Sequence, residues 1–278
     1  MIDFVKDTLL LFPFLFATYL VLEALEARVG GALERFLERA RSVGPAAGAL
    51  AGAIPQCGVS AAAASFYAGG VITAGTLLAV FLSTSDELVP VLVSSRMPVS
   101  LIWKIVGIKA AAALGVGFVV NGVLAVVRHT RREVSVHELC EHSHCGCTGR
   151  KGILVPALIH TLEIFAFIVV ISGAIELCMH YFGEDSLSSL RLNRPFFGEL
   201  AAGALGLIPN CAVSVAGAKL YMAGAMSPGA LMASSFTGSG LGLLVLFRTN
   251  RSLRENLAIL LVVFVIGTLL GMLTGPLL

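Results

Sequence analysis

The sequence has few charged residues. It contains 19 Lys or Arg and 17 Asp or Glu residues among 278, or 13%, against roughly 25% in soluble domains. Because 57% of the residues are hydrophobic, the polar surface is too small to solvate a globule of this size, and most of the exterior must face lipid. These proportions exclude a soluble enzyme, a secreted scaffold and a nucleic-acid-binding protein. The net charge of +2 is also too small to indicate a polyanionic partner.

Signatures of several other protein classes are missing as well. The six Cys residues do not have the spacing of a disulfide framework, because three of them crowd one polar segment. We expect no cleavable signal peptide, since the first seven residues carry two acids and one Lys and no small-residue cleavage pattern follows. No Gly-x-x-x-x-Gly-Lys-Ser/Thr motif occurs, so any ATP would have to act through another subunit.

Apolar segments that approach the length of a bilayer span recur along the chain. They lie near 8–25, 45–66, 70–95, 100–127, 153–182, 197–220, 223–247 and 257–278. These segments must be helical, because lipid cannot satisfy open backbone groups and the apolar runs lack the alternation of a barrel strand. The sequence therefore predicts an all-α polytopic membrane protein.

An internal repeat organises these segments. The motif Pro-x-Cys-x-x-Ser begins at Pro55 and again at Pro209, 154 positions later, and the similarity continues through 67–79 and 221–233. With one residue of slippage, Phe12 also corresponds to Phe165. We predict a first transmembrane repeat at 1–127, a polar connector at 128–151 and a second transmembrane repeat at 152–278.

The orientation of the two repeats depends on the Pro-containing segments. Each segment either crosses the membrane once or returns as two half-helices, because Pro breaks the hydrogen bonding of a helix interior. The distribution of Lys and Arg favours the second version by a small margin, with the connector 128–151 in the cytoplasm. That version makes the two halves inverted repeats, an arrangement common among transporters.

The two Pro-Cys elements are candidate substrate-binding sites. A helix break inside the membrane offers free carbonyls and a helix N-terminus, and a thiol beside it selects soft metals or metalloids. The alternative is an ordinary Pro kink beside a small packing residue, but the duplication favours a binding site. The candidates are Pro55, Gln56, Cys57, Ser60, Pro209, Asn210, Cys211 and Ser214.

Two adjacent acids, Asp86 and Glu87, lie in the middle of the segment 70–95, after Thr84 and Ser85. Carboxylates in hydrocarbon cost several kcal/mol unless they are paired, hydrated or protonated, which indicates that they are used. Their hard oxygen atoms suit Mn²⁺ or a similar ion, and a carboxylate that binds either a cation or a proton allows antiport. The alternative places these acids at a hairpin tip on the surface. The matching stretch 237–241 has no acids.

Other ionisable residues interrupt the apolar segments. His160 and Glu163 share one helical face and can share a proton or chelate one ion, unless they form only a structural pair at a wet interface. Asp7, at the corresponding position of the first half, is a weaker candidate for the same role. Lys109 is expected to extend its ammonium group to the interface, although it could reach an acid.

The polar connector is rich in nitrogen and sulfur ligands. Its six donors are His137, Cys140, His142, His144, Cys145 and Cys147. The spacing matches no standard structural zinc module, but short Cys/His tracts bind borderline or soft cations, and the cytoplasm would keep the thiols reduced. We predict that the connector captures or senses metal. The alternative is a flexible linker with incidental donors.

These elements together resemble a family, the ten-transmembrane heavy-metal exporters of prokaryotes, which include proteins called arsenic efflux proteins and manganese transporters. The resemblance covers nearly the whole chain and is carried by the doubled Pro-x-Cys element, the stretch 84–87, Asp7-Thr8 followed by Pro13 and Glu23, and the His-rich connector. The ten segments of that family imply five per half if each Pro-Cys segment counts as two half-helices. The Pro-x-Cys elements are more distantly similar to those of permeases that export organic arsenicals.

The expected function is export of a metal or metalloid ion, such as Mn²⁺, another divalent cation or an arsenite-like species, across a bacterial or archaeal cytoplasmic membrane. We expect proton-coupled alternating access, no enzymatic activity and no permanently bound cofactor. The expected partners are the lipid bilayer, the transported ion and protons, and a homodimer is left open. An ion channel and an organic-anion transporter are the alternatives.

Overall fold

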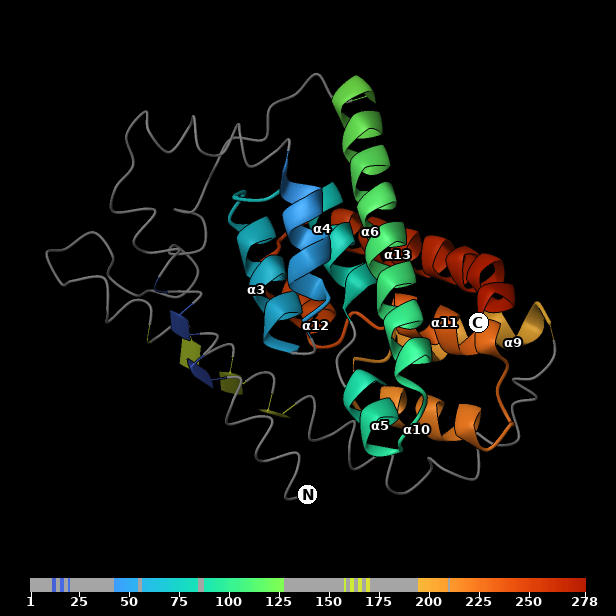
Figure 1. Cartoon of the computed structure of the whole chain (residues 1–278). Helices are drawn as coiled ribbons and strands as arrows, with labels where there is room; N and C mark the ends of the chain where they lie inside the picture. Colours follow the sequence, from blue (N-terminus) through green and yellow to red (C-terminus); the bar gives the residue numbers. More distant parts are fainter. Residues whose placement is uncertain are drawn as a thin grey trace, which may run out of the picture.

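The computed structural model describes residues 43–54, 57–84, 88–127, 195–209 and 211–278, and short pieces at 12–13, 16–17, 20, 158, 161–162, 165–166 and 169–170. This part of the chain is helical and contains no strand (Figure 1). The predicted all-α class is therefore confirmed for the described residues.

Each half contributes five described helices in the same order. In the first half they are Val43–Gly52, α3 (Cys57–Ala68), α4 (Ala74–Ser83), α5 (Leu88–Ser94) and α6 (Val99–Val127). In the second half they are α9 (Phe197–Gly206), α10 (Cys211–Met222), α11 (Pro228–Thr237), α12 (Gly242–Thr249) and α13 (Leu253–Thr274), with a final 3-10 turn η1 (Gly275–Leu277). Every helix of the second half begins 154 positions after its counterpart.

The same local signals start the central helix of each half. Thr73 caps α4 and Ser227 caps α11, and each hydroxyl accepts a hydrogen bond from the backbone N–H three residues later. The turns before these caps contain Gly70 and Gly224, both with φ of 72°, a conformation that favours glycine. The repeated sequence therefore produces a repeated local structure.

Several helices are about half as long as a bilayer span. The helices Val43–Gly52, α4, α9 and α11 each have 10 residues, or about 15 Å, against a hydrocarbon core of about 30 Å. Four stretches of the described helices are nevertheless long and apolar enough to cross a membrane, and two of them join α4 to α5 and α11 to α12. The four stretches are Ala74–Val93, Val99–Val126, Pro228–Thr249 and Leu253–Leu277.

The half-length helices of the first repeat form a hairpin. Positions Gly44 and Gly52 face Thr76 and Ser83 of α4 in order, so the helix Val43–Gly52 runs parallel to α4. Because α3 leads from the end of that helix to the turn that starts α4, it runs in the opposite direction (Figure 1).

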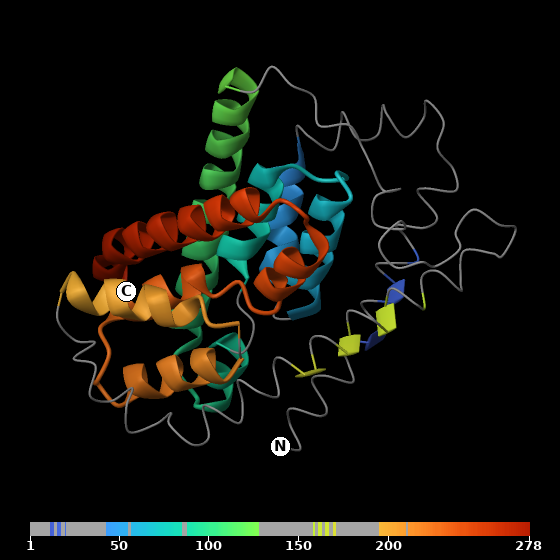
Figure 2. The ribbon, with the colours of Figure 1, turned by 180° about the vertical axis from the view of Figure 1, so that it is seen from behind.

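The two halves exchange contacts reciprocally. Helix α12 of the second half packs on α3 of the first, and α5 of the first packs on α10 of the second, while the equivalent helices α4 and α11 touch each other (Figures 1 and 2). The rings of the corresponding residues Phe12 and Phe165 also meet edge to face, with centroids 5.3 Å apart. The contacts between the halves are therefore reciprocal, because each contacting helix pair has its equivalent with the halves exchanged.

Long and short helices differ in their exposure. On α13 an exposed stripe of large apolar side chains repeats every four residues, as expected for a lipid-facing surface; it consists of Leu253, Leu257, Leu261, Val265, Leu269 and Leu273. On the opposite side, Gly267, Thr268 and Gly271 are buried, and α13 packs there against α11. In contrast, all residues from Gly75 to Ser83 of α4 and seven of the ten residues of α11 are buried, so these two helices lie inside the bundle.

The packing of α13 on α11 depends on a glycine. A Cβ atom at Gly271 would lie 2.5 Å from backbone atoms of Ala233, whereas a Cβ at Gly115 of α6 would meet nothing within 4 Å. We therefore expect Gly271→Ala to lower the stability of the detergent-solubilised protein by about 1–3 kcal/mol, because the helices must separate. The matched variant Gly115→Ala should leave the melting temperature unchanged or raise it. Equal melting temperatures for the two variants would contradict this close approach.

Candidate functional site

The site begins where α4 and α11 end inside the bundle. The last carbonyl groups of a helix have no partner within it and need another donor. Thr84 caps α4 and is 2% exposed, and Gly238 caps α11. In the last turn of each helix, Ser83 and Thr237 donate their hydroxyl hydrogen atoms to carbonyls four residues earlier, which favours bending of the chain at these points.

Lys109 of α6 supplies the missing donor for both helix ends. Its side chain is fully buried, and its Nζ donates hydrogen bonds to the Thr84 carbonyl, to the Ser235 carbonyl at 2.7 Å and to Ser235 Oγ at 2.6 Å. Nζ also lies 5.7 Å from the centre of the Phe236 ring. The ammonium group thus joins α4 of the first half to α11 of the second.

The expectation that Lys109 extends to the membrane interface is wrong. Lys109 lies ten residues into the 29-residue helix α6, on the side that packs against α4. At that depth the C-terminal ends of two helices offer carbonyl acceptors and partial negative charge, which stabilise a buried cation. The equivalent residue of the second half is Val263, which is also fully buried, so only the first half contributes a cation at this position.

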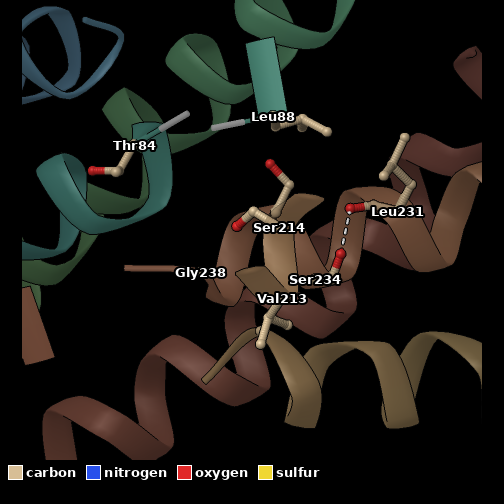
Figure 3. Close-up of a pocket in the computed structure, with 9 residues that line it drawn as sticks. Thr84, Leu88, Val213, Ser214, Leu231, Ser234 and Gly238 are labelled. Carbon is tan, nitrogen blue, oxygen red and sulfur yellow. Dashed lines mark hydrogen bonds between the residues drawn. The ribbon is translucent and has the colours of Figure 1, made fainter. Parts of the chain in front are cut away.

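A small cavity adjoins the residues that hold Lys109. It is lined by Thr84, Leu88, Gly206, Val213, Ser214, Leu231, Ser234, Ser235 and Gly238 (Figure 3). The volume open to the centre of a water molecule is about 10 Å³. This is roughly the room for one water molecule or one small ion. Both halves line it, since Thr84 comes from α4 and Ser214 from the first turns of α10. Its polar lining residues are Thr84, Ser214, Ser234 and Ser235, each of which carries a hydroxyl group.

The equivalent place in the other half is filled. Ser60 of α3 corresponds to Ser214, and it packs against Gly242, which corresponds to Leu88. A Cβ at Gly242 would lie 2.8 Å from Ser60 Cβ and 2.7 Å from the ring of Phe81. Because even a methyl group does not fit there, the repeated scaffold leaves room for a ligand on one side and not on the other.

The predicted site residues are only partly described. Thr84 and Ser214 come together at the cavity, Ser60 is buried at the filled equivalent place, and Pro209 is half-buried after the end of α9. Cys57 and Cys211 are the first residues of α3 and α10, but their side chains lie outside the described residues. The other predicted ligands also lie outside: Asp7, Pro55, Gln56, Ser85, Asp86, Glu87, His160, Glu163, Asn210 and the connector donors His137, Cys140, His142, His144, Cys145 and Cys147.

The metal prediction therefore stays a prediction, because nearly all of its ligands lie outside the described residues. Within them, no three His, Cys, Asp or Glu side chains come together to hold a metal ion. The oxygen atoms of the cavity are hard donors, which suit a hard cation better than a soft one. The ammonium group of Lys109 donates hydrogen bonds to the carbonyls of Thr84 and Ser235. A cation would have to displace this group to bind to the same carbonyls.

No motif marks Ser234 and Ser235, which lie in an ordinary helical stretch, and neither was predicted as a site residue. The predicted environment of Lys109 was also wrong. The sequence does contain one signal that Lys109 is buried. Lys109 lies well inside the apolar segment 100–127, so its ammonium group cannot easily reach water beyond either end. A buried cation at that depth requires partners, and ionisable residues inside membrane segments are by default candidates for function.

No protein-family model, curated protein or solved structure matches this chain.

Proposed function

We propose that this protein is a transporter that exports a metal or metalloid ion across the cytoplasmic membrane of a bacterium or archaeon. The observation that carries the proposal is that half-length helices of both repeats end at one cavity beside a buried cation. Discontinuous helices that meet between two repeats are the usual way in which transporters build a substrate site at the membrane midplane.

The proposed topology has ten segments in two inverted halves. The hairpin made by Val43–Gly52 and α3, and its counterpart α9 and α10, would each enter and return, which leaves an odd number of full crossings per half. An odd number inverts the second half relative to the first. The reciprocal packing of α3 with α12 and of α5 with α10 supports a two-fold relation between the halves.

The proposed mechanism uses competition for the carbonyl groups at the break. In the substrate-free state, the ammonium group of Lys109 satisfies Thr84 O and Ser235 O. A substrate cation that reaches these oxygen atoms would displace the ammonium group, with Cys57, Cys211, Asp86 and Glu87 as further ligands. Protons taken up by the acids on the outer side would then favour release of the ion, because a ligand shifts the equilibrium only through its different affinity for the two states.

A direct test fills the cavity. Ser214→Leu should reduce export from proteoliposomes to the background rate, because the added side chain occupies a space that holds about one water molecule. The matched variant Ala223→Leu adds the same side chain at an exposed position after α10 and should transport normally. Export is measured for Mn²⁺, Zn²⁺ and arsenite in parallel, with and without a proton gradient. Normal export by Ser214→Leu would overturn the assignment of this cavity.

An organic-anion transporter is the second candidate, and one observation favours it. The fixed charge described beside the cavity is the positive charge of Lys109, and the first turns of α10 contribute Val213 and Ser214, so a helix N-terminus is also near. Both features would attract a carboxylate or another small anion. A panel of labelled organic acids in the same proteoliposomes separates the candidates, since uptake of an acid without any metal or metalloid flux would favour the second.

A further inference from the structure

A second buried charge-bearing group lies away from the cavity. Glu199, in the first turn of α9, is 7% exposed. Its Oε1 accepts a hydrogen bond from the Ser227 hydroxyl at 3.5 Å, and its Oε2 is buried without a hydrogen-bond partner. A buried carboxylate with an unpaired oxygen is costly, so its presence needs an explanation.

The carboxyl group faces the N-terminus of α11. Ser227 is the N-cap of that 10-residue helix, and a Cβ at Gly229 would lie 2.7 Å from Glu199 Oε1. The glycine therefore lets the carboxyl group approach the first backbone amides, where the helix dipole stabilises negative charge. This stabilisation acts on the ionised form alone.

In the first half, the group that faces the N-terminus of the central helix is a neutral amide and not an acid. There Asn121 Oδ1 of α6 accepts a hydrogen bond of 3.1 Å from the Gly75 N–H at the start of α4. The position equivalent to Asn121 is Gly275, and the position equivalent to Glu199 is Pro45. A neutral amide thus suffices at the N-terminus of a central helix, and packing alone does not explain an ionisable group in the second half.

No described cation lies beside Glu199 to hold it permanently ionised. The helices packed against α9 are α10, α11 and α13. Helix α11 has no charged residue, and α10 has only Lys219, which is exposed in its last turn. The charged residues of α13, Arg254 and Glu255, are in its first turn, about 26 Å along the helix from Gly271, whose carbonyl lies near Gly229.

We propose that Glu199 is a proton-binding site that controls the position of α11, an inference that rests on the proposed transport function. In the ionised state, the Ser227 hydroxyl donates a hydrogen bond to the carboxylate, and the dipole of α11 stabilises its charge. In the protonated state, a proton from water adds to Oε2, the acid becomes neutral, and its attraction to the N-terminus of α11 weakens. The neighbouring rings of Phe196 and Phe197 are exposed, so Glu199 lies close to the surface of the bundle, from which the proton would reach it.

Helix α11 connects this site to the cavity. Glu199 contacts its first residues, and the Ser235 that Lys109 holds is eight residues further on, about 12 Å along the helix. The same rigid helix thus meets a proton site at its positive end and a fixed ammonium group at its negative end. A change in the attraction at Glu199 therefore acts on an element that lines the cavity.

The test compares Glu199→Gln with the matched variant Glu255→Gln, which removes an acid from the start of α13. Infrared difference spectra of the protein in lipid, recorded between low and high pH, should contain the C=O stretching band of a protonated carboxyl group. One component of this band should be lost in Glu199→Gln and kept in Glu255→Gln, while the contributions of other acids, such as Asp86 and Glu87, should remain in both. The pH profile of export should also flatten in Glu199→Gln alone.

An unchanged band in Glu199→Gln would overturn the proposal. Glu199→Asp provides a second check should the amide variant fail to fold, because it keeps an acid and should keep a shifted band, and an unshifted band would count against the proposal. The spectra do not depend on transport. A protein with the Glu199 band and no metal or metalloid flux would therefore overturn the proposed function while supporting the proton site.

Discussion

Replacement of Lys109 by Met is expected to abolish export and to destabilise the protein strongly. Met keeps most of the apolar stem of Lys but cannot donate a hydrogen bond, so the carbonyls of Thr84 and Ser235 lose their donor inside the bundle. Each buried acceptor left unsatisfied costs about 1–3 kcal/mol, which gives a loss of about 2–6 kcal/mol. The loss should appear as a lower melting temperature of the purified protein and as background export in proteoliposomes.

The matched control is Lys104→Met on the same helix. Lys104 is exposed, so the substitution removes the same charge without opening a buried contact, and stability and export should stay close to those of the unmodified protein. Lys109→Arg should fold better than Lys109→Met, because it retains a cation and donors. Should Lys109→Met melt and transport like Lys104→Met, Lys109 would not be the link between α4 and α11.

The second large effect is expected at the Pro-Cys element and the adjacent acids. Cys57→Ala and Asp86→Asn should each remove cellular resistance to the exported ion while the protein still inserts into the membrane. In the proposed mechanism, the thiol would supply a soft ligand, and the carboxylate would supply the charge that exchanges a cation for a proton. Resistance is measured as growth across a panel of metals and metalloids, with membrane protein quantified by immunoblot.

Cys178→Ala is the matched control for the thiol, because Cys178 lies outside the Pro-Cys elements. It should leave resistance unchanged. Normal resistance in both Cys57→Ala and Asp86→Asn would refute the assignment of these residues to the transport path. A loss in Asp86→Asn alone would indicate a hard cation held by oxygen ligands, without a role for the thiol.

Much of the fold could be predicted from composition and repetition. The apolar segments 70–95, 100–127, 223–247 and 257–278 correspond to the four candidate membrane spans, because backbone groups in lipid leave few options beside a helix. The motif that begins at Pro55 and Pro209 also marks the breaks between paired half-length helices, since Pro removes a hydrogen bond from the helix interior. These signals are local, and local sequence is sufficient to specify them.

The breaks after α4 and α11 were harder to predict. Neither Thr84 nor Gly238 has a Pro beside it, and each segment is apolar enough to suggest an uninterrupted span. The helices end there because other elements satisfy their last carbonyls, in particular Lys109 from α6 for Thr84. A donor 25 positions away along the chain leaves no mark on the sequence around the break.

The sequence alone determined that this protein is helical, lies in a membrane and consists of two similar halves, since these properties follow from hydropathy, from the cost of open backbone groups in lipid and from repeated motifs. Only the tertiary structure decided which polar residues meet. It placed Lys109 against the ends of two helices from different halves, left a cavity beside Ser214 but none beside Ser60, and set Glu199 at the start of α11. Such differences between equivalent positions arise from packing between distant segments, and one residue can change that packing without changing the repeat.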